Sequence, residues 1–389
     1  MSSAGLADRA ALSEDGEAER LRGFGEELDR IRKEIEAQVG EADVRHVRRL
    51  QRFSKVMEAI GRVLLHVSFE PITFIGGVLA LWIHKQLQAT EIGHTALHGA
   101  YDGLTGAEAF DSKRYAWDTP IDEESWRAGH NVKHHQYTNI AGRDPDIHFG
   151  PVRLTPHTPH AKQHRWQLPF TLFMLFPNFG LLMNLHFTGL NDVYYGNGRA
   201  DRHDFLPDRS KESIATAHRK AFRKYLPYYA KNYLLFPLLA GSGFFKVLLG
   251  NWIAEVLRDV YSAATIYCGH VGPETATYPE GTRAHGRGAF YAMQIEASNN
   301  FEVIRPLSIL CGGLDHQIEH HLFPRLPPER LRQIAPSVRV ACERYGVRYH
   351  TGSWPKILGQ ALGRIRELSR PQPGESPGRG FRAVVREMV

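Results

Sequence analysis

Residues 63–83 read VLLHVSFEPITFIGGVLALWI, twenty-one residues with one acid, Glu70, and one proline, Pro71. A single helix across a bilayer needs about 20 apolar residues, so the length is sufficient. A carboxylate and a proline at mid-bilayer are both unfavourable, because one is charged and the other removes a backbone hydrogen bond. The stretch therefore predicts two short spans, about 55–69 and 71–93, that turn at 69–71.

A second apolar region predicts a similar hairpin, with spans at about 232–249 and 251–269. The second of these spans carries Glu255, Arg258 and Asp259, and charges inside a membrane usually face the interior of a helix bundle. We therefore expect an all-α integral membrane protein with about four transmembrane helices in two hairpins and a cytoplasmic helical cap.

Residues 168–190 are also apolar but are interrupted at Pro177. The stretch after them, 199–231, holds nine Lys and Arg residues against four acids. By the positive-inside rule both flanks of 168–190 stay in the cytoplasm. This segment is therefore predicted to be interfacial or re-entrant.

The composition is compatible with short hairpins joined by polar segments. Of 389 residues 42% are hydrophobic and 23% charged, and the mean hydropathy is −0.35. These values exclude a fully embedded bundle and a disordered chain. The net charge of +6 suits an anionic membrane surface, an anionic substrate or nucleic acid. Because the chain also has predicted membrane spans and histidine clusters, we expect no nucleic-acid partner.

Three regions are expected along the chain. Residues 1–54 form an amphipathic cytoplasmic region, helical from about 17 to 62 and without a secretory signal. Residues 55–336 form the main domain. Residues 337–389 form a C-terminal cytoplasmic segment that ends in a flexible tail, PQPGESPGRG.

Histidine is unusually frequent, with 21 copies against three cysteines, Cys268, Cys311 and Cys342. Eight histidines lie in three short clusters, at 91–102 (EIGHTALHGAYD), 126–139 (WRAGHNVKHHQYTN) and 315–324 (DHQIEHHLFP). Four-residue spacing places two histidines of each cluster on one face of a helix. Eight imidazoles exceed the four to six ligands of one metal, so the pattern predicts two metal ions. The eight are His94, His98, His130, His134, His135, His316, His320 and His321.

The ligand types narrow the choice of metal. Imidazole suits Zn, Cu, Fe and Ni. No HExxH helix is present, and only Glu91 and His94 form a Glu-x-x-His pair, whereas the carboxylate-bridged di-iron bundles need two. A di-iron, oxygen-activating centre is the best remaining interpretation.

The three clusters resemble the histidine boxes of membrane fatty acid desaturases. The resemblance extends from about residue 45 to residue 336. HTALH, HNVKHH and HQIEHHLFP occur in the family's order, and the QIEHH form is similar to that of front-end desaturases and of bacterial acyl desaturases. The resemblance implies two iron ions on the cytoplasmic face of a multi-pass protein of the bacterial inner membrane. It also implies O2 as co-substrate and electrons from a separate donor.

The family's ligands transfer to individual positions. His94 and His98 match the first box, His130, His134 and His135 the second, and His320 and His321 the third. The lead ligand of the third box stays open, because spacing selects His316 and the family pattern selects Gln317. His270, after the last predicted span, resembles a further ligand of the family.

The resemblance implies O2-dependent desaturation of a fatty acyl chain, carried as acyl-CoA or acyl-lipid. Two alternatives stay open: a hydroxylase or ketolase on the same scaffold, and a histidine-rich metal transporter. Three scattered cysteines cannot build a rubredoxin or a ferredoxin, and no His-Pro-Gly-Gly haem-binding phrase occurs. A separate ferredoxin, rubredoxin or cytochrome b5 with its reductase is therefore the expected donor.

Side chains beside the boxes are candidates for binding the substrate. The nearby aromatic residues either line an apolar tunnel for the acyl chain or only pack in the protein core. The nearby arginines either bind a phosphate of CoA or of a phospholipid or form a basic face exposed to solvent. The aromatic candidates are Trp117, Trp126, Tyr137 and Phe149, and the arginines are Arg114, Arg127, Arg143 and Arg153.

Overall fold

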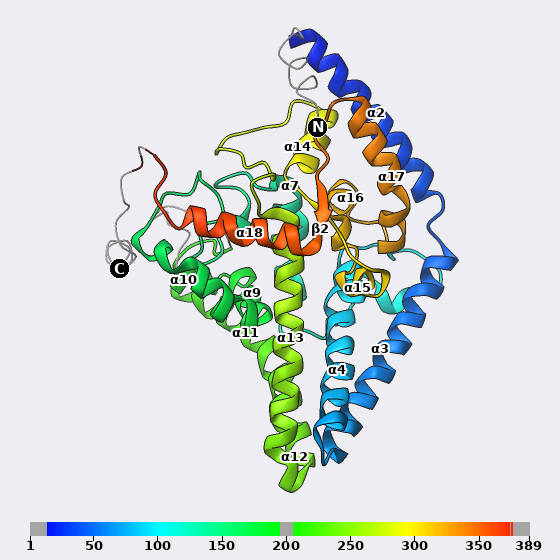
Figure 1. The fold of residues 1–389 in the computed structure, drawn as a ribbon, viewed down its shortest axis with the longest axis vertical. Coiled ribbons are helices and arrows are strands. Elements are labelled where there is room, and N and C mark those ends of the chain that lie inside the picture. The colour runs from blue at the N-terminus through cyan, green and yellow to red at the C-terminus, as the bar shows by residue number, and fades with distance from the viewer. Residues whose placement is uncertain (1–13, 195–204, 374, 376–389) are drawn as a thin grey trace.

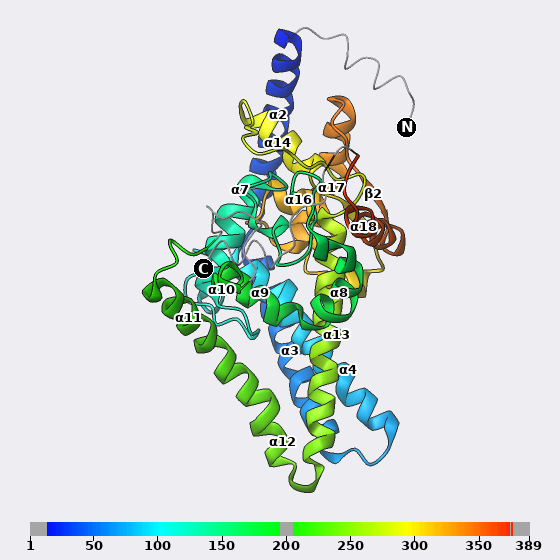
Figure 2. The same cartoon turned by 90° about the vertical axis from the view of Figure 1, so that its left-hand side faces the viewer.

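The computed structural model describes residues 14–194, 205–373 and 375. Its described part is mostly helical, with long helices that extend downward from a broad cap of shorter elements (Figures 1 and 2). Most of the predicted tail lies outside the described residues.

The first hairpin consists of α3 (Glu41–Val67) and α4 (Pro71–Leu87), and it turns where the sequence predicts. The Glu70 carboxylate caps α4 by accepting hydrogen bonds from the Ile72 and Thr73 backbone N–H groups at 2.6 and 2.7 Å. Pro71 begins the helix, where its missing N–H costs nothing. Two glycines, Gly61 and Gly77, let the helices approach closely, since a Cβ on Gly61 would lie 2.8 Å from the Leu81 backbone nitrogen.

The second hairpin turns earlier than predicted. Its first arm is α11 (Lys211–Ala230), η9 (Lys231–Leu235) and α12 (Phe236–Leu239), and its second is α13 (Phe244–His270), joined by η10 (Gly241–Gly243). The boundary predicted near residue 250 is therefore wrong. Gly250 lies inside α13 because it packs there: a Cβ would meet Leu65 at 2.5 Å. Gly241, with φ +55°, is the glycine at the turn.

The charged residues of α13 are buried between the hairpins, as predicted. The Lys85 ammonium lies 2.7 Å from the Glu255 carboxylate. Arg258 is paired with Glu255 and lies 3.0 Å from Asp259. Each of these charges has an opposite charge beside it, which burial requires.

The segment 162–194 is a chain of short pieces. It contains η6 (Lys162–Trp166), α8 (Gln167–Phe170), η7 (Thr171–Leu175), η8 (Phe176–Asn178), α9 (Phe179–Phe187) and α10 (Leu190–Tyr194). Among the described residues, Lys162–Phe187 is the one helical stretch whose length and composition suit a membrane crossing. The helices of the two hairpins are shorter or carry more charged residues than this stretch. For example, α13 contains Lys246, Glu255, Arg258 and Asp259.

The N-terminal helix expected over 17–62 is two helices. α2 (Glu14–Glu36) ends before Gly40, and α3 begins at Glu41. α2 packs in the cap against α14 (Arg287–Glu296) and α17 (Pro328–Arg344). The predicted domain boundary at 54 falls inside α3.

The rest of the cap is built from short elements around one small parallel strand pair. β1 (Asn300–Glu302) pairs with β2 (Thr351–Ser353). The helices are α5 (Thr95–Leu97), η3 (Glu108–Phe110), α6 (Glu123–Trp126), η5 (Pro145–Ile147), α15 (Arg305–Cys311) and α18 (Trp354–Leu368), in addition to those that carry the histidine clusters.

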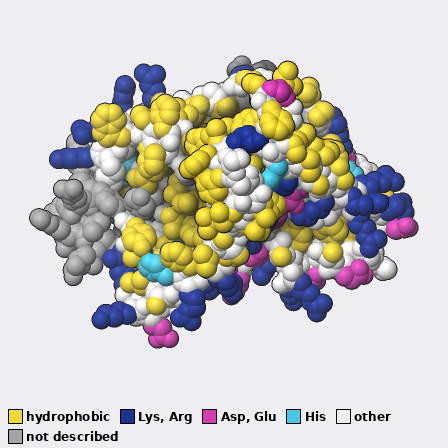
Figure 3. Space-filling model, turned by 90° about the horizontal axis from the view of Figure 1, so that it is seen from below, with side chains coloured by type: hydrophobic (Ala, Val, Ile, Leu, Met, Phe, Trp, Pro, Cys, Tyr) yellow, Lys and Arg dark blue, Asp and Glu magenta, His cyan; other side chains and the backbone are white. Residues whose placement is uncertain are grey.

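The hairpins expose apolar side chains along their length. Phe69 is fully exposed and Ile72 is 81% exposed. Seen from below, hydrophobic side chains cover much of the molecule (Figure 3). The exposed apolar residues of the second hairpin are Phe222, Leu226, Leu234, Leu235, Leu238, Leu239, Phe245, Leu249, Trp252, Leu257 and Val260.

Candidate metal centre

The first two histidine clusters lie on π-helical turns, where an α-helix was expected. η2 (Gln88–His94) precedes His98, and a Cβ on Gly93 would lie 2.2 Å from the Trp117 Nε1. That close approach lets the Trp117 Nε1–H donate to the Gln88 carbonyl at 2.9 Å. Such π-helical turns occur often at functional sites.

The other candidate ligands reach the same place from three further segments of the chain. η4 (Arg127–His134) and α7 (His135–Tyr137) carry the second cluster. η11 (Leu314–His316) and α16 (Gln317–Leu322) carry the third. His270 is the last residue of α13.

The structure brings nine of the predicted ligands into one buried site. One group, which we call group 1, has ligand atoms within 4.8 Å of one another and consists of His94, His98, His130 and His320. A second, group 2, meets the same limit with His134, His270 and His321. The His135 Nε2 lies 3.3 Å from the His130 Nε2, and its ring centroid lies 4.3 Å from that of His321, so His135 lies between the groups. Gln317 adjoins group 2.

The distances within the groups fit metal ligation. The His94 and His98 Nε2 atoms lie 3.2 Å apart, and the His134 and His270 Nε2 atoms lie 3.3 Å apart. Two imidazoles bound at about 2.1 Å to one ion have nitrogens about 3.0 to 3.4 Å apart. The Nε2 atoms of His320 and His321 are buried without a hydrogen-bond partner. Buried polar atoms normally have partners, so these nitrogens fit a bound cation.

Hydrogen bonds on the outer nitrogens orient several rings. The His134 Nδ1 lies 3.0 Å from the Asp144 carboxylate, and the His270 Nδ1 lies 3.3 Å from the Ala297 carbonyl. The His321 Nδ1 lies 3.0 Å from the Gln294 Oε1. A proton held on Nδ1 leaves the Nε2 lone pair free for a metal.

Burial sets the protonation of the histidines. It lowers the pKa of six of them well below the ordinary value, and neighbouring histidines lower it further, so these imidazoles are neutral and able to bind metal. The six are His94, His98, His135, His270, His320 and His321. Burial also lowers the pKa of His134, but the Asp144 and Asp146 carboxylates outweigh it and raise that pKa to about 9.

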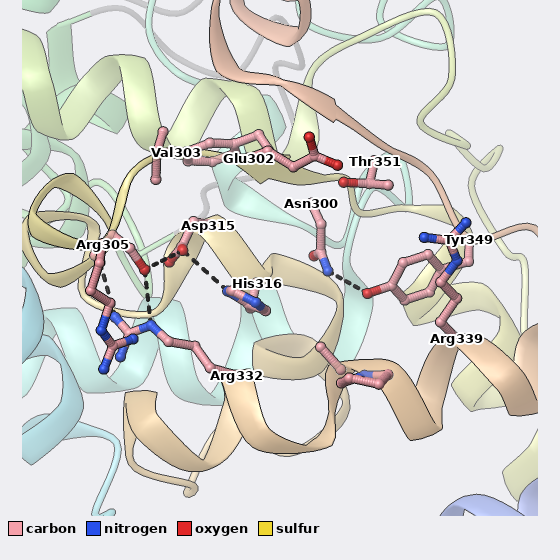
Figure 4. A pocket seen from close by; sticks show the side chains of 14 residues that line it. Asn300, Glu302, Val303, Arg305, Asp315, His316, Arg332, Arg339, Tyr349 and Thr351 are labelled. Carbon is pink, nitrogen blue, oxygen red and sulfur yellow. Dashed lines mark hydrogen bonds and ion pairs between the residues drawn. The ribbon is translucent and has the colours of Figure 1, made fainter.

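The two candidates for the third-box lead ligand lie in different places. The Gln317 side-chain amide lies 2.7 Å from the His270 Nε2, and its Oε1 is buried without a hydrogen-bond partner. His316 faces an outer pocket on the wall of the cap, where its Nδ1 lies 3.2 Å from the Asp315 carboxylate (Figure 4). Gln317, and not His316, therefore adjoins the histidine groups.

A largely apolar cavity lies beside both groups. Its walls include Trp117, Trp126, Ile121, Phe179 and Met183, together with four histidines of groups 1 and 2. Trp126 stacks on His130 with ring centroids 4.5 Å apart. Trp117 and Trp126 thus lie where a tunnel was predicted.

The other two aromatic candidates lie elsewhere. Tyr137 lines a different surface cavity, and Phe149 packs against Phe179 and His186. Among the arginine candidates, Arg153 is fully buried and bonded to Glu375 and nearby carbonyls, so it is structural.

Sequence reasoning missed the residues that orient the rings. Asp144 lies ten residues after His134, in the phrase GRDPDI, which follows the second box. Thr138 and Gln294 contact the His321 Nδ1 from elements far apart in sequence. Thr138 and Asp144 had a local signal, because they lie in and shortly after the second histidine cluster, whereas Gln294 had none.

The fold and the site define a mostly helical protein with a buried, histidine-rich centre that can hold metal. Residues 71–353 match the fatty acid desaturase family. The chain is 35% identical over 357 residues to the NADPH-dependent stearoyl-CoA 9-desaturase of Mycobacterium tuberculosis, which covers 90% of this chain and 80% of that protein. It is 27% identical over 291 residues to the sn-1 linoleoyl-lipid 6-desaturase of Synechocystis. That match covers 73% of this chain and 77% of the Synechocystis protein.

The chain therefore belongs to the fatty acid desaturase family. It is an oxidoreductase of lipid metabolism, and members of its family use iron and are associated with membranes.

Proposed function

We propose that this protein inserts a carbon–carbon double bond into a fatty acyl chain at a di-iron centre. Group 1 would hold one iron and group 2 the other, with His135 between them and Gln317 beside group 2. The observation that carries this proposal is the convergence of nine buried or half-buried side chains, most with neutral imidazoles, beside an apolar cavity. All-nitrogen sites without thiolate suit iron.

Iron bound here would supply the reduction of O2 and the removal of two hydrogens from unactivated methylenes. The overall reaction balances as one acyl –CH2–CH2– unit, O2, two electrons and two protons giving –CH=CH– and two waters. The chain's own residues hold the acyl chain: Ile121, Phe179 and Met183 provide apolar contacts, and Trp126 covers the His130 ring. These walls exclude water and fix which carbons face the histidines.

The substrate we propose is an acyl-CoA. The relative matched over nine-tenths of this chain is named for stearoyl-CoA. The relative named for an acyl-lipid is less similar. An acyl-lipid substrate is therefore the second candidate.

We also propose that both hairpins cross the inner membrane of a bacterial cell and that the cap lies in the cytoplasm. The exposed apolar side chains of α3, α4, α12 and α13 support this, because water-exposed apolar surface of that extent is unfavourable. Lys and Arg along α11, next to the cap, fit a cytoplasmic location. Residues 168–190 would lie at the interface.

Fatty acid profiling of an expressing host tests the proposed reaction. We expect a new unsaturated fatty acid with the wild-type chain and none with His320→Ala, although that variant is still present in the membrane. A hydroxylated or oxo product would select the hydroxylase or ketolase alternative. Zinc as the sole bound metal, with no oxidised product, would favour a transporter and contradict the proposal.

A further inference from the structure

A surface cavity of about 410 Å³ lies behind the metal centre. We propose that it is the docking site of a small acidic electron-transfer protein that supplies the electrons for desaturation, an inference that rests on the proposed function. The cavity lies between two parts of the chain: the end of α7 with the loop that follows it, and α14 with the loop that precedes it. Its walls include Gln136, Tyr137, Thr138, Ile140, Arg143, Thr282, Arg283, Phe290, Met293 and Gln294.

The cavity wall touches a metal-ligand candidate directly. The Thr138 hydroxyl donates to the Gln294 Oε1 at 2.9 Å, and these two oxygens lie 3.1 and 3.0 Å from the His321 Nδ1. The Nε2 of the same ring belongs to group 2. A redox group held in the cavity is therefore separated from group 2 by one layer of side chains.

The charge of the cavity selects an acidic partner. Among the described residues that line it, Arg143 and Arg283 are charged and none is acidic. Both are exposed, and neither has an ion-pair partner among the described residues. The Arg143 guanidinium lies 5.3 Å from the centroid of the Tyr137 ring, which helps to fix its position. Carboxylates on a partner would pair with both arginines and speed its association.

The position of the cavity separates the donor from the substrate. It shares no lining residue with the apolar cavity beside groups 1 and 2. An acyl chain can therefore stay bound while the donor docks. This matters because one turnover needs two electrons, so a one-electron carrier must dock twice per double bond.

The outer pocket at His316 fits this role less well. Its lining combines Arg305, Arg332 and Arg339 with the acids Glu302 and Asp315 (Figure 4). Arg305 is already paired with Glu329. The Asn300 amide there donates to Glu319 at 2.8 Å, and Glu319 belongs to neither histidine group.

Direct binding tests the proposal without requiring turnover. The purified full-length protein is titrated with a plant-type [2Fe–2S] ferredoxin, with a rubredoxin and with cytochrome b5, and the Kd of each is measured at low and high salt. We expect Arg143→Glu/Arg283→Glu to raise the Kd of the binding donor at least tenfold. The matched control, Arg339→Glu/Arg366→Glu, reverses two exposed cap arginines and should change the Kd less than twofold.

Three results would overturn the inference. One is an equal loss of binding in the control, which would indicate a nonspecific charge effect or docking at the outer pocket that Arg339 lines. Another is no binding of any of the three donors by the wild type. The third is a raised KM for acyl-CoA in the double variant with unchanged donor binding, which would assign the arginines to substrate phosphate. If the proposed function is wrong but the docking site is right, the results differ from these three. The Arg143→Glu/Arg283→Glu variant would still weaken donor binding, but the wild type would form no double bond.

Discussion

At the scale of single residues, Gln317 and His316 show how contacts decide between two ligands that spacing leaves open. Gln317 adjoins the His270 Nε2, whereas His316 faces the outer pocket. We predict that His316→Ala keeps two irons per chain and that His270→Ala keeps at most one. Plasma mass spectrometry of iron per protein measures both. Loss of iron in His316→Ala would contradict the assignment.

Asp144 makes a second prediction at this scale. It is fully buried and lies 3.0 Å from the His134 Nδ1. Asp144→Asn should weaken metal binding about ten- to a hundredfold, because the ring of His134 loses its orienting carboxylate. Titration of the metal-free protein with Fe²⁺ gives the affinity. Asp111→Asn, a half-buried turn residue that contacts neither histidine group, is the control, and equal affinities in the two variants would refute the role.

The identity of most candidate ligands was predictable from sequence, since imidazole clusters at four-residue spacing are rare without a metal. Their grouping was not predictable. His320 joins the group of His94, whereas its neighbour His321 joins that of His134. That division depends on how four separate segments pack against one another. The spacing of residues along one helix gives no information about this packing.

At the scale of elements, the π-helical turn η2 depends on a glycine. A Cβ at Gly93 would lie 2.3 Å from the Gln88 carbonyl oxygen and would collide with Trp117. Gly93→Ala should therefore lower iron content and the midpoint of thermal unfolding. Gly359→Ala, in α18 with no atom within 4 Å of the added Cβ, is the matched control; it should leave the iron content unchanged and should not lower the midpoint, because alanine favours the helix. An unchanged Gly93→Ala protein would show that the π-helical turn is not required.

The hairpins show what sequence patterns do and do not specify. The first turn was predicted correctly because Glu70 and Pro71 give a local helix-start signal. In the second hairpin the turn predicted near residue 250 was wrong, because the sequence has glycines at both 241 and 250. Packing against Leu65 places Gly250 inside α13, and the turn lies at Gly241. The all-helical prediction was right apart from the small pair of β1 and β2.

At the scale of the whole molecule, the proposed topology places the hairpin turns and the cap on opposite sides of the membrane. We predict that cysteines introduced as Phe69→Cys and Ser242→Cys react with an impermeant maleimide from the periplasmic side. Gly281→Cys, in the cap, should react only after the cells are opened. The three native cysteines are buried, so they give little background. Labelling of all three positions from one side would refute the two-hairpin topology.

The most direct test of the central claim is the product formed from stearoyl-CoA by the iron-loaded protein with O2, NADPH and a donor system. The account predicts a product with two hydrogens fewer and one double bond, formed by the wild type and by His316→Ala but not by His320→Ala. A product that gains oxygen instead, or an unchanged yield in His320→Ala, would contradict it.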